Sequence, residues 1–249
     1  MNALVTGASS GIGRAVAERL AASGARVFLV ARRAALLDEV AAGIRATGGR
    51  AESLVLDVAE TERAVARLRA LDHELGGLDL VVANAGVGAP ASVAAYSWEA
   101  IAAACHTNFC GAAATLTAVL PAMVARRRGH LVGISSLAAV GALPRSAAYC
   151  APKAGLSMLL ECLRLDLLDT PVRVTAVHVG FVRTGMVAHS THPMPQLLEP
   201  EVVARRIVAA IHAGHEHLDL PQPLAAATRL LGRLPSVLRD RVWRHQRFV

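Results

Sequence analysis

Tyr149 and Lys153 are the residues whose spacing most clearly predicts chemistry. The chain has 26 basic residues, of which 25 are arginines and one is a lysine, and that lysine lies four residues after one of only two tyrosines. On a helix, positions i and i+4 share a face, so the two polar heads can meet. A nearby ammonium favours the phenolate and lowers the pKa of tyrosine, which is about 10 in the free residue. Arginine is a poor substitute because its guanidinium is wide, planar and always charged. The pair therefore predicts proton transfer.

The helix that carries this pair should begin close to Ala148 or Tyr149. Pro152 lies inside the pair, and proline is tolerated in a first turn, where the amides have no partner within the helix. Such a start would place Tyr149 near the positive end of the helix dipole, which would also favour the phenolate.

A serine pair closes an apolar run thirteen residues before Tyr149, in Ile134-Ser135-Ser136. Open α/β sheets bind ligands at the carboxyl ends of their strands, so a hydroxyl there can hold a substrate oxygen. Two serines also commonly end a strand without any further role.

A glycine-rich turn follows the first apolar run and reads Thr6-Gly7-Ala8-Ser9-Ser10-Gly11-Ile12-Gly13. Glycines allow the backbone N–H groups of a helix N-terminus to approach a pyrophosphate. The turn predicts a dinucleotide site, and the alternative is a tight connection from strand to helix. The expected contacts are Gly7, Ser9, Ser10, Gly11, Ile12 and Gly13.

Arg32 and Arg33 follow the second apolar run, where a protein that prefers NAD(H) would place an acid for the ribose 2′-hydroxyl. A guanidinium suits a 2′-phosphate, so the sequence favours NADP(H) over NAD(H). The alternative is that both arginines only solvate the start of a helix. Asp57, with Val58 after it, closes the third run and is either an adenine contact or a helix-capping residue.

Short apolar runs alternate with longer segments of helical period along the chain. This pattern predicts a doubly wound parallel sheet with helices on both faces, a three-layer α/β/α Rossmann fold. We expect one domain over residues 1–249, with a substrate loop or lid at 185–200, a helix at 201–213 and a basic helical tail at 222–249. The predicted strands are residues 3–5, 26–30, 52–56, 78–83, 130–134 and 172–177.

Composition and charge exclude several classes of protein. The chain is 54% hydrophobic and 18% charged, so it can bury a core, and most of its +7 charge belongs to arginines after residue 228. A basic surface with stacking aromatics is missing from the main body, so we expect no nucleic-acid partner. Four cysteines without a CxxC pair predict a reducing cytoplasmic location and no metal site. Residues 100–125 carry no charge, but their alanines and polar residues favour a buried or subunit-packing helix over a membrane span.

Together these motifs resemble the short-chain dehydrogenase/reductase family in its compact single-domain form. The resemblance covers residues 2 to about 184. The glycine turn matches the family's TGxxxGxG, Asn84-Ala85-Gly86 its NAG motif, and Tyr149 to Lys153 its YxxxK. Ser136 matches the catalytic serine and Asn108 the helix asparagine. Ala83 stands where NNAG has its first asparagine, and Val179 where PG has its proline.

The resemblance implies a role for each matched residue. Tyr149 would be the general acid or base in a hydride transfer between the nicotinamide and a carbonyl or alcohol. Ser136 would hold the substrate oxygen, Lys153 would bind the nicotinamide ribose, and Asn108 would anchor a water relay. Val182 and Thr184 would hold the carboxamide. A NADP(H)-binding sensor or scaffold that has lost catalysis is the alternative, and it would be expected to have a damaged tetrad.

The substrate and the partners are less defined by the sequence. The predicted loop at 185–200 offers Met186, Val187, Met194, Leu197 and Leu198, with His189 and His192 and no cation. This composition favours a neutral, lipophilic ketone, aldehyde or secondary alcohol. The basic tail should be a packed or solvated helix, with a subunit interface or peripheral contact with an anionic membrane as alternatives. A homodimer or homotetramer is expected.

Overall fold

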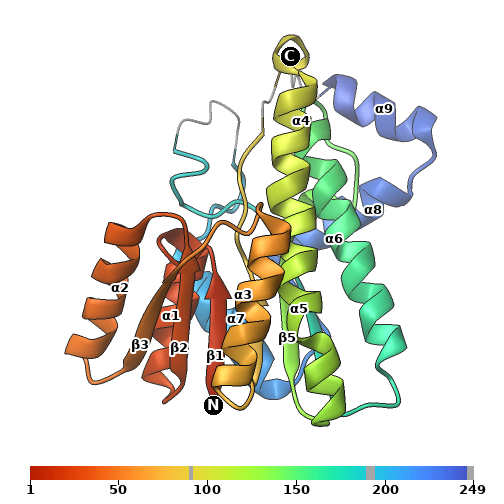
Figure 1. Cartoon of the computed structure of the whole chain (residues 1–249). Coiled ribbons are helices and arrows are strands. Elements are labelled where there is room, and N and C mark those ends of the chain that lie inside the picture. Colours follow the sequence, from red (N-terminus) through yellow and green to blue (C-terminus); the bar gives the residue numbers. More distant parts are fainter. Residues whose placement is uncertain (90–91, 189–193, 246–249) are drawn as a thin grey trace.

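The computed structural model describes residues 1–89, 92–188 and 194–245. Seven parallel strands form one sheet in the order β3-β2-β1-β4-β5-β6-β7 (Figure 1). The strands are β1 (Asn2–Thr6), β2 (Arg26–Ala31), β3 (Arg50–Val55), β4 (Leu80–Ala83), β5 (His130–Ser136), β6 (Arg173–Val179) and β7 (His217–Leu220). The order reverses between β1 and β4, and a crevice for ligands is expected at this point in a doubly wound sheet. The predicted fold is confirmed.

Helices cover both faces of the sheet. One face packs against α1 (Gly11–Ala22), α2 (Ala34–Ala46) and α7 (Pro200–Ala213). The other packs against α3 (Thr61–Glu74), α5 (Ala112–Ala125) and α6 (Ala147–Asp166). Short 3-10 turns lie at η1 (Val93–Ala95) and η3 (Leu137–Ala139), and α8 (Gln222–Arg233) and α9 (Ser236–His245) follow the last strand.

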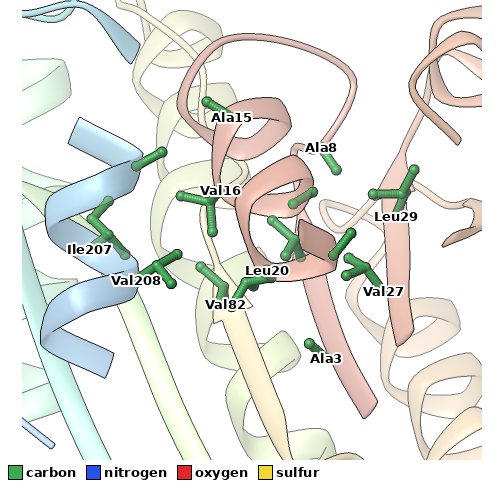
Figure 2. Close-up of a cluster of buried hydrophobic side chains, with 14 of the residues drawn as sticks. Ala3, Ala8, Ala15, Val16, Leu20, Val27, Leu29, Val82, Ile207 and Val208 are labelled. Atoms are coloured by element: carbon green, nitrogen blue, oxygen red, sulfur yellow. The ribbon is translucent and has the colours of Figure 1, made fainter. Parts of the chain in front are cut away.

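The five central strands are mostly apolar because both of their faces are buried, whereas the edge strands β3 and β7 carry exposed polar residues. Figure 2 shows this in the first core layer, where Val16 and Leu20 of α1 and Ile207 of α7 pack over the sheet residues Val27 and Val82. All five side chains are fully buried. The packing fixes the N-terminus of α1, which carries the glycine turn, against the end of β1.

A long helical segment runs from α4 (Trp98–Cys105) through a π-helix, η2 (His106–Gly111), into α5. It is the one segment in the described part of the chain that is long and apolar enough to cross a membrane, judged by length and composition, and half of its most apolar window is buried. Leu116, Val119 and Met123 of α5 lie in the second core layer. The buried half agrees with the expected buried or subunit-packing helix, and packing of the other half on a second subunit stays a prediction.

The seventh strand, β7, was missing from the predicted set. Its four residues, His217-Leu218-Asp219-Leu220, have no continuous apolar run, because β7 lies at the edge of the sheet and alternates polar with apolar side chains. The carboxyl end of β5 was also predicted too early, since the strand continues through both serines to Ser136.

Two predicted helix starts agree with the structure. Helix α7 begins at Pro200, one residue before the predicted start, and α6 begins at Ala147, one residue before Ala148. The argument from Pro152 was nevertheless wrong in one respect. Pro152 is the sixth residue of α6 and lies in its second turn, where it lacks the N–H that would bond the Ala148 carbonyl. The helix continues past it to Asp166.

Candidate active site

A cleft of about 970 Å³ opens at the carboxyl ends of the strands, and most of the sequence-predicted site residues line it. Those residues are Gly7, Ser9, Ser10, Gly11, Ile12, Arg32, Arg33, Asp57, Val58, Asn84, Ala85, Gly86, Ser136, Tyr149, Lys153, Val182 and Thr184. The two predicted residues that do not line it are Gly13 and Asn108. Both lie behind the wall and shape it.

Gly13 permits the close packing of the glycine turn. A Cβ at this position would collide with the Gly7 carbonyl and the Asn84 side-chain amide. Gly7 has a φ of 67°, in the left-handed region that favours glycine. The Asn84 amide nitrogen donates to the Thr6 carbonyl over 2.9 Å, so its side chain joins the end of β4 to the turn after β1. Asn84 therefore stabilises the position of the glycine turn.

Arg33 lies across the glycine turn. Its guanidinium donates to the Ser9 and Ser10 hydroxyls, each over 2.9 Å. Arg32 is also exposed, and it forms an ion pair with Asp57 at 3.6 Å. The other carboxylate oxygen of Asp57 accepts from the Ala59 backbone N–H over 3.0 Å. Asp57 is not the helix cap, because the N-cap of α3 is Glu60. It closes the turn before that helix and lines the cleft, so the adenine contact stays a prediction.

Tyr149 and Lys153 meet on one face of α6, as their spacing predicts. The Lys153 ammonium lies 6.0 Å from the centre of the Tyr149 ring and donates to the Ile134 carbonyl over 2.9 Å. Ser136 is at the end of β5 and is 7% exposed. Its hydroxyl donates to the Val179 carbonyl over 3.2 Å and accepts from the Ala138 N–H over 3.1 Å. These contacts fix the hydroxyl at the cleft wall.

The expected fall in the pKa of Tyr149 does not occur. Burial raises the pKa of the Tyr149 phenol above its usual value of 10.0, and the Ser136 hydroxyl opposes this only in part. Burial also lowers the pKa of Lys153 from 10.5 to about 8. The sequence argument counted the neighbouring ammonium and the helix dipole, but it could not count the removal of water from both groups. Tyr149 therefore remains a protonated donor at neutral pH.

Asn108 lies in the π-helix and is fully buried. Its side-chain oxygen accepts from the Val87 N–H over 2.8 Å, and its amide nitrogen donates to the Val87 carbonyl over 3.0 Å. A Cβ on Gly86 would lie 2.9 Å from that oxygen and 3.6 Å from the Lys153 nitrogen. Asn108 and Lys153 therefore approach the same stretch of backbone, and Gly86 leaves the space between them.

Val182 and Thr184 reach the cleft from the segment after β6. Val182 pairs with Leu198 in an isolated β-bridge, and the Arg183 N–H donates to the Leu198 carbonyl over 2.9 Å. A Cβ on Gly11 would lie 2.8 Å from the Thr184 methyl group, so Thr184 packs directly on the glycine turn. The β-bridge closes the base of the predicted substrate loop.

Further residues of the cleft come from the predicted substrate loop, the loop before α6 and the C-terminal helices. Met186, Val187 and Pro195 of the predicted loop take part, while Met194 and Leu197 line a neighbouring groove. His189 and His192 lie outside the described residues. The other contributors were not predicted from the sequence and are Leu143, Pro144, Arg145, Leu224, Ala227, Thr228, Leu231 and Trp243.

Two of these unpredicted contributions change the view of the site. Arg145, just before α6, brings a cation to the cleft, has a left-handed φ of 60°, and makes no hydrogen bond or ion pair with the described residues. The second contribution is α8, which supplies four residues of the apolar wall. Their signal in the sequence was weak, because the amphipathic period of the tail predicts a packed helix without saying what it covers. Among the described residues no group of three or more His, Cys, Asp or Glu side chains could hold a metal ion.

A crevice at the reversal of a parallel sheet, with a glycine turn at a helix N-terminus, defines a dinucleotide-binding α/β protein. The chain belongs to the short-chain dehydrogenase family, whose model matches residues 1–195. It is a NAD(P)-dependent oxidoreductase.

Three similar proteins place the chain within this family. An uncharacterized oxidoreductase of Myxococcus xanthus is 46% identical, with 98% of this chain and 97% of the relative aligned. A variant of the actinorhodin polyketide ketoreductase, solved with NADPH, has a TM-score of 0.80 at 28% identity and aligns over 88% of this chain and 95% of its own. A short-chain dehydrogenase/reductase of Burkholderia phymatum, solved with NAD, has a TM-score of 0.83 at 25% identity and aligns over 92% of each chain. A nicotinamide cofactor is thus supported.

Proposed function

We propose that this protein interconverts a ketone or aldehyde and the corresponding alcohol with NADP(H), and that Tyr149 is its general acid or base. The observation that carries the proposal is the convergence of Tyr149, Lys153 and Ser136 at one end of a cleft whose other end is the glycine turn. The similarity to a polyketide ketoreductase supports the same reaction class.

The residues present fit a nicotinamide dinucleotide. A Cβ at Gly7 or Gly13 would fill the close approach at the turn, and the backbone amides at the start of α1 suit a pyrophosphate. Gly7, Ser9, Ser10, Gly11, Ile12 and Gly13 would hold the phosphates, Asp57 and Val58 the adenine, and Asn84, Ala85 and Gly86 the adjoining ribose wall. Val182 and Thr184 would hold the carboxamide. When bound, the nicotinamide supplies or accepts the hydride.

The preference for NADP(H) rests on Arg32 and Arg33. Arg33 donates to two serines of the glycine turn. A 2′-phosphate could bind this guanidinium either in place of the two hydroxyls or together with them. Arg32 has only a 3.6 Å contact with Asp57. Two guanidinium groups at the end of β2 favour a ribose that carries a 2′-phosphate over one with a free 2′-hydroxyl.

The chain's own residues would handle the proton. The raised pKa of Tyr149 keeps the phenol protonated, so it can donate to a carbonyl oxygen as charge develops there. Ser136 would turn its hydroxyl hydrogen from the Val179 carbonyl to the same oxygen, and Lys153 would bind a ribose hydroxyl. Asn108, fixed by two hydrogen bonds to Val87, would anchor a water relay to bulk solvent. At neutral pH the free protein therefore presents the protonated phenol that the reductive direction needs.

The substrate would be lipophilic, because Leu143, Met186, Leu224, Leu231 and Trp243 line the end of the cleft beside Tyr149. This supports the expectation of a neutral ketone, aldehyde or secondary alcohol. Arg145 is a further cation of the cleft besides Lys153, so substrates with and without an anionic group belong in the same test.

The test is NADPH oxidation with a panel of ketones and aldehydes of increasing chain length, each with a neutral and a carboxylate-bearing member. We expect turnover with the longer neutral members. Tyr149→Phe should lower kcat by at least about 100-fold and leave the Kd for NADPH within about twofold. Tyr96→Phe is the matched control because it removes the other tyrosine hydroxyl, which accepts from the Ala147 N–H. Tight NADPH binding without turnover on any substrate would instead favour the sensor or scaffold.

The assembly and location are part of the same proposal. We propose a homodimer or homotetramer in the cytoplasm, without a nucleic-acid partner. The four cysteines carry free thiols, which agrees with a reducing compartment. Equilibrium sedimentation at low and high protein concentration would test the assembly.

A further inference from the structure

A chain of polar contacts behind the active site joins Lys153 to helix α8. The parallel register aligns Ser135 of β5 with His178 of β6, and His178 with Asp219 of β7. Aligned positions on neighbouring strands present their side chains to the same face of a sheet. Three polar residues therefore lie side by side in three adjacent strands that are otherwise mostly apolar.

The contacts along this chain are short. The Ser135 hydroxyl donates to the Lys153 carbonyl over 3.0 Å and lies 2.8 Å from the Ser157 hydroxyl. The Ser157 hydroxyl lies 3.1 Å from the His178 Nε2 atom. The His178 Nδ1 atom lies 3.0 Å from the Asp219 carboxylate, and since a carboxylate only accepts, this nitrogen is the donor. His178 is 5% exposed.

Asp219 also binds Arg229, a side chain of α8. Arg229 donates to both carboxylate oxygens of Asp219, with Nε to one oxygen over 2.9 Å and Nη2 to the other over 3.0 Å. The hydrogen bond from His178 and then the ion pair with Arg229 lower the pKa of the Asp219 carboxyl, so it is ionised at neutral pH. A bidentate pair of this kind fixes direction as well as distance.

The position of α8 determines the apolar end of the cleft. Leu224, Ala227, Thr228 and Leu231 of α8 line it, and Arg229 lies between the last two. A Cβ on Gly232 would collide with the Val140 carbonyl, so α8 also packs closely on the loop before α6. Figure 1 shows α8 and α9, in blue, on the side of the molecule that carries α6. Arg229 forms the ion pair that ties this helix to the sheet.

We infer that Arg229, Asp219 and His178 are positioning residues that hold α8 as the substrate wall of the cleft, in register with the helix that carries Tyr149 and Lys153. The expected rise in KM rests on the proposed function, whereas the anchoring of α8 does not. The three residues touch neither the substrate nor the cofactor site. They act by fixing a wall against which the substrate is placed.

The variant that tests the anchor is Arg229→Met, which removes the ion pair and keeps a long apolar stem. We expect amide exchange in residues 222–233 to rise about tenfold, while exchange in α6 and in the glycine turn stays within twofold. With the best substrate of the panel, KM should rise about tenfold, and kcat and the Kd for NADPH should stay within about threefold. Arg229→Lys should recover part of the loss, because one charged contact remains.

Arg233→Met is the matched control, since Arg233 lies on the same helix, is exposed, and makes no hydrogen bond or ion pair with the described residues. It should match the wild type in every readout. Asp219→Asn should reproduce Arg229→Met, and the double variant should be no worse than the more severe single variant, because both remove one interaction.

The two proposals fail in different ways. Wild-type protein that binds NADPH but turns over no substrate would overturn the proposed function, and the exchange experiment would still test the anchor. Unchanged exchange in residues 222–233 of Arg229→Met would overturn the anchor, even with an active enzyme. A fall in kcat at constant KM would also overturn it, because it would place Arg229 in the chemical step.

Discussion

Replacing Lys153 by methionine should stabilise the protein while removing its activity. Lys153 is 4% exposed, and its ammonium donates to the Ile134 carbonyl of β5. Burial lowers its pKa from 10.5 to about 8. Since the lowered pKa measures the penalty for the charged form, the folded protein at pH 7 holds an ammonium that would be more stable in water.

The magnitude follows from the pKa. A change from 10.5 to about 8 corresponds to about 3 kcal/mol of lost stability at pH 7. Methionine removes this penalty at similar volume, but it leaves the Ile134 carbonyl without its 2.9 Å donor, which costs about 1 kcal/mol. The net expectation is a gain of about 2 kcal/mol, or about 4–8 °C in Tm for a protein of this size.

The sign of the pH dependence gives a stricter test. The folded pKa lies below the unfolded one, so between about pH 8 and 10.5 the unfolded chain binds more protons and wild-type stability rises with pH. The advantage of Lys153→Met in urea unfolding should therefore be full at pH 7 and shrink toward pH 10. A variant that is less stable than the wild type at pH 7, or whose advantage is the same at pH 7 and pH 10, would refute the reasoning.

Lys153→Arg is the partner of this experiment, because it keeps the charge. A guanidinium is wider than an ammonium, and its pKa is too high for it to lose a proton. Overpacking a buried site costs about 1–3 kcal/mol, so this variant should be less stable than the wild type. Both variants should lose most of the turnover, because neither offers a compact ammonium beside Tyr149.

Three further predictions concern other parts of the molecule. Arg33→Ser removes the guanidinium that bonds the glycine turn, so KM for NADPH should rise at least about tenfold while KM for NADH stays within twofold; equal changes for both cofactors would contradict the assigned phosphate contact. Gly13→Ala forces a Cβ into the backbone of the turn and should abolish dinucleotide binding in a fluorescence titration. Its control is Gly43→Ala, in open space on α2, which should raise the free energy of unfolding by about 0.4–1 kcal/mol. Intact binding by Gly13→Ala would contradict the packing argument. Burial lowers the pKa of His130 from 6.5 to about 4, so its protonation destabilises the fold as the pH falls from 6.5 through 4. Between pH 7 and pH 4 the wild type should therefore lose about 3 kcal/mol more of its unfolding free energy than His130→Gln does. Parallel curves of stability against pH for the two proteins would show that His130 is not the responsible group.

The sheet and the glycine turn could be predicted because their signals are local. A strand buried on both faces needs a continuous apolar run, and six such runs predicted six of the seven strands. Strand β7 was missed because its four residues alternate polar with apolar side chains and offer no continuous apolar run. The assignment of site residues depended on motif spacing, and the structure gathers nearly all of them along one cleft.

The electrostatics of the site could not be predicted in the same way. The sequence shows that an ammonium lies four residues from a phenol, and this argues for a lower tyrosine pKa. The fold adds the partial burial of the phenol, which raises its pKa more than the hydrogen bond with Ser136 lowers it. Desolvation depends on every element packed around a group, and no spacing along the chain reports it.

The cleft likewise combines features that local sequence predicts with features that depend on the tertiary structure. The sequence by itself determined the parallel sheet, the dinucleotide turn and the Tyr149–Lys153 pair, since each depends on residues a few positions apart. Only the tertiary structure placed Arg145 in the cleft, laid α8 along its apolar wall, and aligned Ser135, His178 and Asp219 across three strands. The strand contacts join residues far apart in the chain, such as His178 and Asp219. They exist because parallel register and helix packing bring distant segments together, and local periodicity carries no record of that alignment.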